Sequence, residues 1–374
     1  MPGVYISWPF CAQKCTYCNF ASGVFPRELE RDYLDALCAE IAAAEWTWQP
    51  NTVYLGGGTP GSLSGEQLSR ILALVPGMPW TEATIECAPG SLQREHVSAW
   101  RAAGINRVSL GVQSFIAEEL RRSGRKHTAE GVARDVALLR ECGIDEINLD
   151  LIAGLPAQTP DTWQQSLDWI ERLAPPHVSV YMLEIDEDSR LGAELLRGGT
   201  RYGAGDAPDE DTTVQLYEAA VERLAGGGWA RYEISNFARP GHESAHNLKY
   251  WRLEPYLGFG SDAHGFDGAT RVQNSESPAD YVARWKRGES ACTESTPAQP
   301  DEERFFVGLR LMEGIAVDAE QRRPHTERIA ALVAADLLED SGSRLTLTAR
   351  GVLLSNEVFQ EFIGSPCPTW PCPV

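Results

Sequence analysis

The sequence predicts an α/β fold, a partial (β/α)6 barrel of parallel strands followed by a smaller C-terminal winged-helix-like unit. Three observations predict it. Six short strand-like segments rich in β-branched and aromatic residues alternate with amphipathic helical segments up to about residue 185. Polar or glycine residues follow each of these six segments. From residue 301 onward two helical stretches precede the strand-like SRLTLTARG. Strands that alternate with helices favour a parallel sheet with right-handed crossovers.

The strand candidates, in chain order, are VYISW (4–8), TVYLG (52–56), ATIEC (83–87), RVSLGVQ (107–113), INLDLI (147–152) and HVSVYM (177–182). Between the first two, the segment 31–46 places Tyr33, Leu34, Leu37, Cys38 and Ile41 on one helical face. Ser64 with Gln67 indicates a capping box at the start of a second helix. Thr159 followed by Pro160 indicates a further helix start.

The remaining chain is less regular. An acidic loop, GDAPDED (205–211), precedes a helix expected from about Thr213, and the polar stretch 289–303 is expected to be a linker. We therefore predict three units: residues 1–185 as the barrel, 186–295 as an extension that carries the motif HNLKYW, and 301–374 as the C-terminal unit and tail.

Composition restricts the class of protein. The chain has 374 residues and a formal net charge of −20, which disfavours binding to nucleic acid or to anionic lipid. No apolar run is long enough to span a membrane, and the N-terminus does not resemble a signal peptide. We expect a cytoplasmic protein whose nine cysteines are thiols, metal ligands or catalysts rather than disulfides.

Three cysteines, Cys11, Cys15 and Cys18, follow the first predicted strand within eight residues. Three interpretations compete: a zinc site that needs a distant fourth ligand, a disulfide framework, or a four-iron cluster with one iron free of protein ligands. The open iron of such a cluster suits chelation by the amine and carboxylate of S-adenosylmethionine. The six predicted strand ends supply glycines, carboxylates and a nearby arginine to one rim, which is where parallel β/α folds build their sites.

The motif C-x3-C-x2-C, with Tyr17 before the last cysteine, resembles the signature of the radical S-adenosylmethionine (SAM) superfamily. VYISWPFC, GGGTP (56–60), RVSLGVQSF (107–115) and NLDLIAGLPAQT (148–159) are similar to the oxygen-independent coproporphyrinogen III oxidase group. The likeness to the heme chaperones of the HemW family runs from end to end.

The resemblance implies a [4Fe-4S] cluster on the three cysteines and S-adenosylmethionine beside it. By position, the cofactor-binding residues it implies are Tyr5, Tyr17, Gly57, Gly58, Thr59, Glu86, Gln113, Arg125, Asp150 and Glu184. One departure is Ser7, where the family commonly has a histidine; it leaves the three cysteine ligands unchanged.

Two functions remain: a chaperone that carries heme to acceptor proteins without coproporphyrinogen oxidase activity, or a radical enzyme of the oxidase type or a related methyltransferase. The oxidase pattern has a fourth cysteine where this chain has Phe20, and it has a long N-terminal extension where this chain has three residues before Val4. HNLKYW (246–251) matches the chaperone pattern. It makes His246 a candidate heme ligand, with Tyr250 and Trp251 packed on the macrocycle. The alternative is that His246 lies in a loop and the two aromatic residues fill the core.

Two features complete the predictions. The C-terminal unit carries seven basic and twelve acidic residues, so DNA binding through it is not expected. The tail holds two Cys-Pro pairs, at Cys367 and Cys372, for which a role in heme uptake is a hypothesis beside that of a plain mobile tail. By resemblance, a homodimer is also expected.

Overall fold

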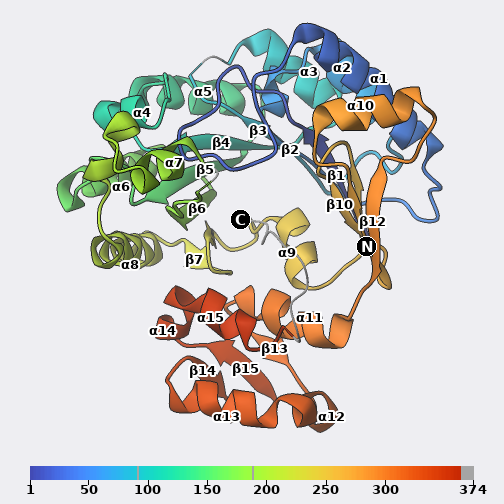
Figure 1. Ribbon diagram of the computed structural model, residues 1–374. Coiled ribbons are helices and arrows are strands. Elements are labelled where there is room, and N and C mark those ends of the chain that lie inside the picture. Colours follow the sequence, from blue (N-terminus) through green and yellow to red (C-terminus); the bar gives the residue numbers. More distant parts are fainter. Residues whose placement is uncertain (91, 188, 364–374) are drawn as a thin grey trace.

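The computed structural model describes residues 1–90, 92–187 and 189–363, and it contains a partial barrel of six parallel strands (Figure 1). The strands are β1 (Gly3–Trp8), β2 (Thr52–Gly57), β3 (Glu82–Cys87), β4 (Arg107–Gln113), β5 (Glu146–Ala153) and β6 (His177–Met182). They are hydrogen-bonded in chain order, each to the next and in parallel. The predicted fold class is confirmed, and all six predicted strands lie within these bounds.

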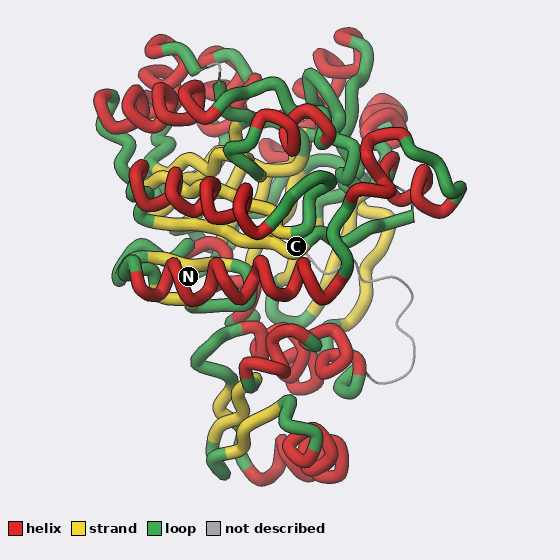
Figure 2. The backbone as a smooth tube through the Cα atoms, turned by 90° about the vertical axis from the view of Figure 1, so that its left-hand side faces the viewer, coloured by secondary structure: helices red, strands yellow, loops and turns green. Residues whose placement is uncertain are grey.

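Helices cover the outer face of the strands, as Figure 2 shows from the side. They are α1 (Arg27–Ala43), α2 (Gly65–Leu72), α3 (Arg94–Ala102), α4 (Ala117–Arg122), α5 (Ala129–Glu141) and α6 (Pro160–Leu173), with a short 3-10 helix, η1 (Pro60–Ser62). The five predicted apolar residues of α1 are all buried. Ser64 and Gln67 form the predicted capping box, and Thr159 caps α6 with Pro160 in its first turn.

The core lies between the helices and the sheet. Val4, Ile6, Val53 and Leu55 are fully buried in this layer. Tyr5, which alternates with them on β1, is only partly buried because successive side chains of a strand point to opposite faces. The barrel interior is therefore built from the polar and aromatic positions of the same strands.

The middle of the chain widens the sheet on both edges. Its elements are α7 (Arg190–Leu196), η2 (Arg201–Asp206), α8 (Glu210–Gly226), β7 (Ala230–Arg231), β8 (Asn236–Ala238), α9 (Ala245–Trp251), β9 (Tyr256–Phe259), β10 (His264–Phe266), β11 (Thr270–Asn274), α10 (Pro278–Lys286) and β12 (Cys292–Pro297). β9 pairs in parallel with β1, and β10 to β12 continue from it antiparallel. On the other edge, β8 pairs antiparallel with β6.

The linker predicted at 289–303 is wrong, because β12 and the start of α11 occupy it. β12 pairs with β11 along its length, and all but the first of its residues are exposed. Backbone hydrogen bonds hold an edge strand whatever its side chains are, so a solvated strand of Thr, Ser and Glu reads as a linker. The helix expected from Thr213 begins earlier, at Glu210, because Asp209 caps it.

The C-terminal unit lies below the barrel in Figure 1 and contains a three-stranded antiparallel sheet. Its elements are α11 (Pro300–Val307), η3 (Gly308–Arg310), β13 (Ile315–Ala316), α12 (Ala319–Arg322), η4 (Arg323–His325), α13 (Thr326–Ala334), β14 (Leu338–Asp340), β15 (Arg344–Leu347), α14 (Ala349–Leu353) and α15 (Ser355–Gln360). Cys367 and Cys372 lie outside the described residues. No helix among the described residues is long and apolar enough to cross a membrane.

Candidate cofactor site

The three cysteines lie on a loop between β1 and α1 that is fixed at several backbone points. At its two ends, Cys11 N donates to Gly23 O at 2.8 Å, and Gly23 N donates to Pro9 O at 2.9 Å. At its middle, Thr16 N donates to Ser123 O at 3.2 Å, and Thr16 O accepts from Leu191 N at 2.8 Å. The loop is therefore held by β1, by the turn after α4 and by the start of α7, which orients its thiols over the end of the barrel.

A cavity of about 450 Å³ opens at the carboxyl ends of the parallel strands, under this loop. Twelve of the fourteen residues predicted from the sequence as metal or cofactor ligands line it. They are Cys11, Cys15, Tyr17, Cys18, Gly57, Gly58, Thr59, Glu86, Gln113, Arg125, Asp150 and Glu184. Strand ends far apart in the sequence thus meet at one place, as the barrel topology requires.

The glycine run after β2 passes close to the backbone of the cysteine loop. Gly58 N donates to Trp8 O at 2.8 Å, and Thr59 N donates to Phe10 O at 3.0 Å. A Cβ on Gly58 would lie 2.7 Å from the carbonyl carbon of Pro9, which no real Cβ tolerates. Only glycine allows this close approach, which positions the loop that carries the cysteines.

Two carboxylates enter the cavity from β3 and β5. Tyr54 donates its hydroxyl hydrogen to Glu86 at 2.8 Å. Burial raises the pKa of Glu86 to about 7, and the negative charge of Asp150 acts in the same direction. Burial also raises the pKa of Asp150, although its hydrogen bonds with Ser109 and Asn148 oppose the increase. A cation or a hydrogen-bond donor placed beside either carboxylate would therefore stabilise its ionised form.

Gln113 and Arg125 present hydrogen-bonding atoms that the protein itself does not satisfy. Among the described residues, Oε1 of Gln113 and Nε of Arg125 are buried without a partner. Gln113 also holds the left-handed backbone conformation, with φ of 67°, and Arg125 donates to the Tyr17 hydroxyl at 3.0 Å. Buried polar groups in proteins are normally paired, so an unpaired acceptor and an unpaired donor in one cavity indicate a ligand with complementary groups.

Sequence reasoning missed several residues of this wall, among them Ser109, His127 and Tyr181. Ser109 stands four positions before the predicted Gln113, so alternation within β4 was the signal available for it. Tyr181 stands three positions before Glu184, so alternation gave no signal for it. His127 had no signal in the sequence. It contacts the carbonyl oxygen of Val112 through Nε2 at 3.1 Å, and burial lowers its pKa to about 4.

Two predicted residues do not line the cavity. Tyr5 stacks on Tyr54, with ring centroids 6.2 Å apart, beside the wall of the cavity. His246 is fully buried on α9. Its Nδ1 contacts the Thr52 hydroxyl at 2.9 Å, at the amino end of β2, and its Nε2 contacts the Tyr250 hydroxyl at 2.8 Å.

The alternative that places His246 in a loop is wrong, because His246 lies within α9 and is fully buried. Both ring nitrogens have protein partners, and burial together with the nearby Lys249 lowers its pKa to about 3, so the ring is neutral. The ring also stacks on Tyr54, with centroids 5.3 Å apart. A chain of contacts thus runs from Glu86 through Tyr54 and His246 to Tyr250, from one end of the barrel to the other.

The donor set of the cavity fits an iron–sulfur cluster better than a single ion. Within the residues that the structure describes, no three His, Cys, Asp or Glu side chains converge as the ligands of one metal ion would. In a multi-iron cluster each cysteine thiolate binds a different iron. The three cysteines that hold such a cluster therefore need only line the same cavity, without converging on one point. Cys11, Cys15 and Cys18 do so, and the unpaired groups of Gln113 and Arg125 lie in the same cavity.

Comparisons with known proteins agree with this arrangement. The radical SAM superfamily profile matches residues 5–170. The chain is 35% identical to a protein named heme chaperone HemW from Bacillus subtilis, over 97% of this chain and all of that protein. It is also 35% identical to the HemW of Mycobacterium tuberculosis H37Rv, over 97% of this chain and 95% of that protein.

A solved structure of coproporphyrinogen III oxidase, HemN, from Escherichia coli superposes with a TM-score of 0.82 at 24% identity, covering 96% of this chain and 90% of that one. At this identity the superposition shows a shared fold, from the barrel through the C-terminal unit.

Proposed function

The chain belongs to the HemW family of the radical SAM superfamily, and from this premise we propose that it is a cytoplasmic heme chaperone that binds heme and transfers it to acceptor proteins. The end-to-end similarity to proteins named heme chaperones carries the proposal. The matching proteins cover both the barrel and the C-terminal unit, so the likeness is not confined to the cofactor-binding half.

The proposal includes a [4Fe-4S] cluster and S-adenosylmethionine in the cavity at the strand ends. Cys11, Cys15 and Cys18 would hold three irons of the cluster. Arg125 suits a carboxylate, since its unpaired Nε and its charge both favour an anionic oxygen. Glu86 and Asp150 suit the amine and the ribose hydroxyls. The cluster supplies the electron and the coordination position that radical SAM chemistry uses, while this chain's residues bind and orient the cofactor.

The test compares two activities on one anaerobic, cluster-loaded preparation. Heme titration followed by absorbance is expected to show stoichiometric binding, and incubation with an apo-hemoprotein is expected to move the heme to the acceptor. Coproporphyrinogen is expected to remain unchanged when reductant and S-adenosylmethionine are supplied. Decarboxylation of coproporphyrinogen without heme transfer would overturn the proposal in favour of a radical enzyme of the oxidase type.

A further inference from the structure

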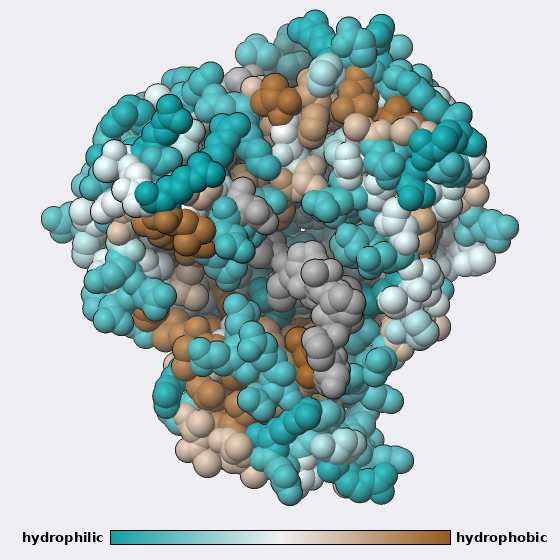
Figure 3. Space-filling model, in the orientation of Figure 1, coloured by the Kyte–Doolittle hydropathy of each residue, from teal (hydrophilic) through white to brown (hydrophobic). Residues whose placement is uncertain are grey.

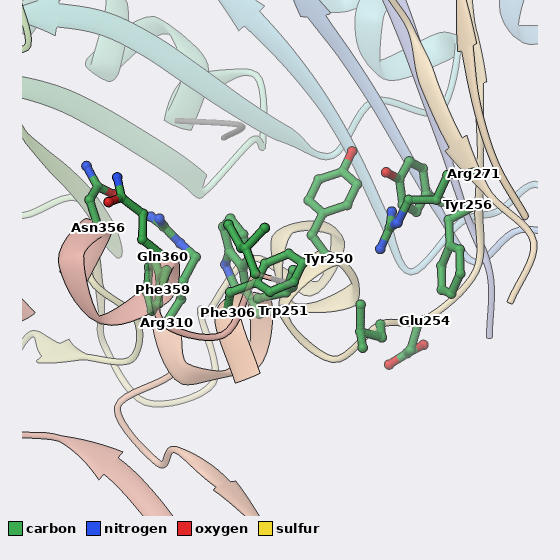
Figure 4. A pocket seen from close by; sticks show the side chains of 14 residues that line it. Tyr250, Trp251, Glu254, Tyr256, Arg271, Phe306, Arg310, Asn356, Phe359 and Gln360 are labelled. Atoms are coloured by element: carbon green, nitrogen blue, oxygen red, sulfur yellow. The ribbon is translucent and has the colours of Figure 1, made fainter. Parts of the chain in front are cut away.

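A second cavity, of about 270 Å³, lies between α9, the outer strands of the sheet and the C-terminal unit (Figure 4). We call it the junction cavity. Tyr250 and Trp251 enter it from α9, Arg271 from β11, Arg310 from η3, and Phe359 from α15. None of its lining residues lines the cavity of about 450 Å³ at the carboxyl ends of the parallel strands. Figure 3 shows hydrophobic residues on the left-hand side of the C-terminal unit and in further patches on the barrel, on a face that is otherwise mostly hydrophilic.

The walls of the junction cavity suit a flat apolar group. Trp251 and Phe359 are buried side chains of the wall, and Phe306 is half-buried beside them. Tyr250 packs edge to face against Tyr256, with centroids 4.7 Å apart, which fixes the orientation of its ring. Cavities built from aromatic side chains with a few polar groups are typical small-molecule sites.

Two buried donors in this wall have no acceptor. Within the described part of the chain, Nε of Arg310 and Nε1 of Trp251 have no hydrogen-bond partner. The guanidinium of Arg310 lies over the Trp251 ring, 4.5 Å from its centroid, and only about 8% of the residue is exposed. Two neighbouring N–H groups, one of them cationic, match the two oxygens of a carboxylate.

One positively charged side chain of the junction cavity is not fully paired with protein carboxylates, so the cavity can accept one anionic group. Glu233 contacts Nη2 of Arg310 at 3.4 Å, a long contact that leaves Nε available. Arg271 is paired with Glu303, and Glu254 is paired with Lys249 at 3.3 Å and with the N-terminal amine at 3.1 Å. Arg310 is therefore the cation of this wall whose pairing is incomplete.

We propose that the junction cavity binds the propionate-bearing edge of a porphyrin. Arg310 and Trp251 donate to one propionate, and the aromatic walls pack on the ring. The volume is below that of a typical site for a whole drug-sized molecule, so one edge of the macrocycle enters, and the rest extends past the exposed Asn356 and Gln360 of α15.

The inference takes its ligand class from the proposed function, and it adds that recognition needs neither iron nor an axial ligand. His246 contributes only by holding Tyr250 through the 2.8 Å contact with its hydroxyl. An iron-free porphyrin is therefore expected to bind, and blocking its propionates is expected to weaken binding by about tenfold or more, the usual effect of losing a hydrogen bond to a charged group.

The experiment titrates the full, cluster-loaded chain under anaerobic conditions with protoporphyrin IX and with its dimethyl ester, followed by fluorescence. The free acid is expected to bind about tenfold or more tightly than the ester, and Arg310→Met is expected to remove that difference. Because Arg310→Met removes the ion-pair partner of the buried Glu233, a second variant acts at the exposed rim. Asn356→Trp fills the entrance and is expected to weaken binding of the free acid, whereas Glu357→Trp, on the neighbouring exposed position outside the cavity, is not.

Equal affinity for acid and ester, or unchanged binding in Asn356→Trp, would overturn the inference. If heme still binds and transfers in that case, the proposed function stands and only the junction cavity is excluded. Absence of binding by both heme and protoporphyrin IX would overturn the proposed function as well. Retained S-adenosylmethionine binding in each variant confirms that the barrel remains folded.

Discussion

The ionisation of Glu86 leads to a prediction about the pH dependence of S-adenosylmethionine binding. Burial raises the pKa of Glu86 to about 7 in the ligand-free protein, with Asp150 adding to the increase. S-adenosylmethionine carries a sulfonium and an amine, so a cation beside Glu86 favours the ionised carboxylate and lowers its pKa in the complex. Binding therefore releases a proton, and the affinity rises with pH.

The magnitude follows from this pKa. At pH 6 about a tenth of Glu86 is ionised, and at pH 8 about nine tenths, so the affinity is expected to rise by about tenfold between these values. The carboxylate faces the cavity and is only partly shielded from water, which makes tenfold an upper value.

The assay is isothermal titration calorimetry of the cluster-loaded protein with S-adenosylmethionine at pH 6, 7 and 8, in buffers of different ionisation enthalpy. Glu86→Gln keeps the hydrogen-bonding shape and is expected to lose the increase in affinity and the proton release. Glu66→Gln makes the same charge change at an exposed position of α2 outside the cavity and serves as the control, expected to keep both. A Glu86→Gln profile as steep as that of the unmodified protein would refute the assignment.

Four further outcomes are expected. Tyr54→Phe removes the hydrogen bond that lowers the pKa of Glu86, so the midpoint of the binding profile should move to higher pH; an unmoved midpoint in the same titrations contradicts the contact. Because the pKa of Glu86 is raised in the folded protein, the ligand-free protein loses stability as pH rises from about 4.5 through 7. Glu86→Gln should therefore raise the thermal unfolding midpoint at pH 8 and not at pH 4. Equal midpoints of the variant and the unmodified protein at pH 8 would count against this. Gly58→Ala should abolish cluster loading, read by iron content, because its Cβ collides with Pro9, whereas Gly226→Ala, which meets nothing within 4 Å, should not. His246→Ala should lower stability by about 2 to 5 kcal/mol and leave the absorbance spectrum of bound heme unchanged; a lost heme band with normal stability would restore its role as an axial ligand.

The sequence predicted those parts of the site whose signals are local. Cys11, Cys15 and Cys18 are neighbours in the chain, and Glu86, Gln113 and Asp150 each stand at or near the end of a strand that reads clearly as a strand. In a parallel barrel the carboxyl ends of all strands lie at the same end, so residues at those positions are expected to lie close together once the strands are recognised. This is why twelve predicted ligands meet in one cavity although they span residues 11 to 184.

The parts that could not be predicted depend on long-range packing. The burial of His246 is set by Thr52, which is 194 residues away in the sequence, and no periodicity connects them. The junction cavity joins α9 to α15 across more than a hundred residues, and Arg310 acquires its incomplete pairing only when Glu233 and Trp251 are placed beside it. β12 lacks the apolar alternation by which strands are recognised, since nearly all of its residues are solvated.

The cluster on the cysteine loop is the claim on which the cofactor site depends, and its iron content tests it most directly. Iron and acid-labile sulfide are measured on anaerobically reconstituted chain, on Cys15→Ser and on the matched control Cys142→Ser, whose thiol is half-buried and outside the cavity. We predict about four irons and four sulfides per chain for the unmodified protein and for the control, and a loss of most of both in Cys15→Ser. A colourless unmodified protein without sulfide, or full iron occupancy in Cys15→Ser, would contradict the account.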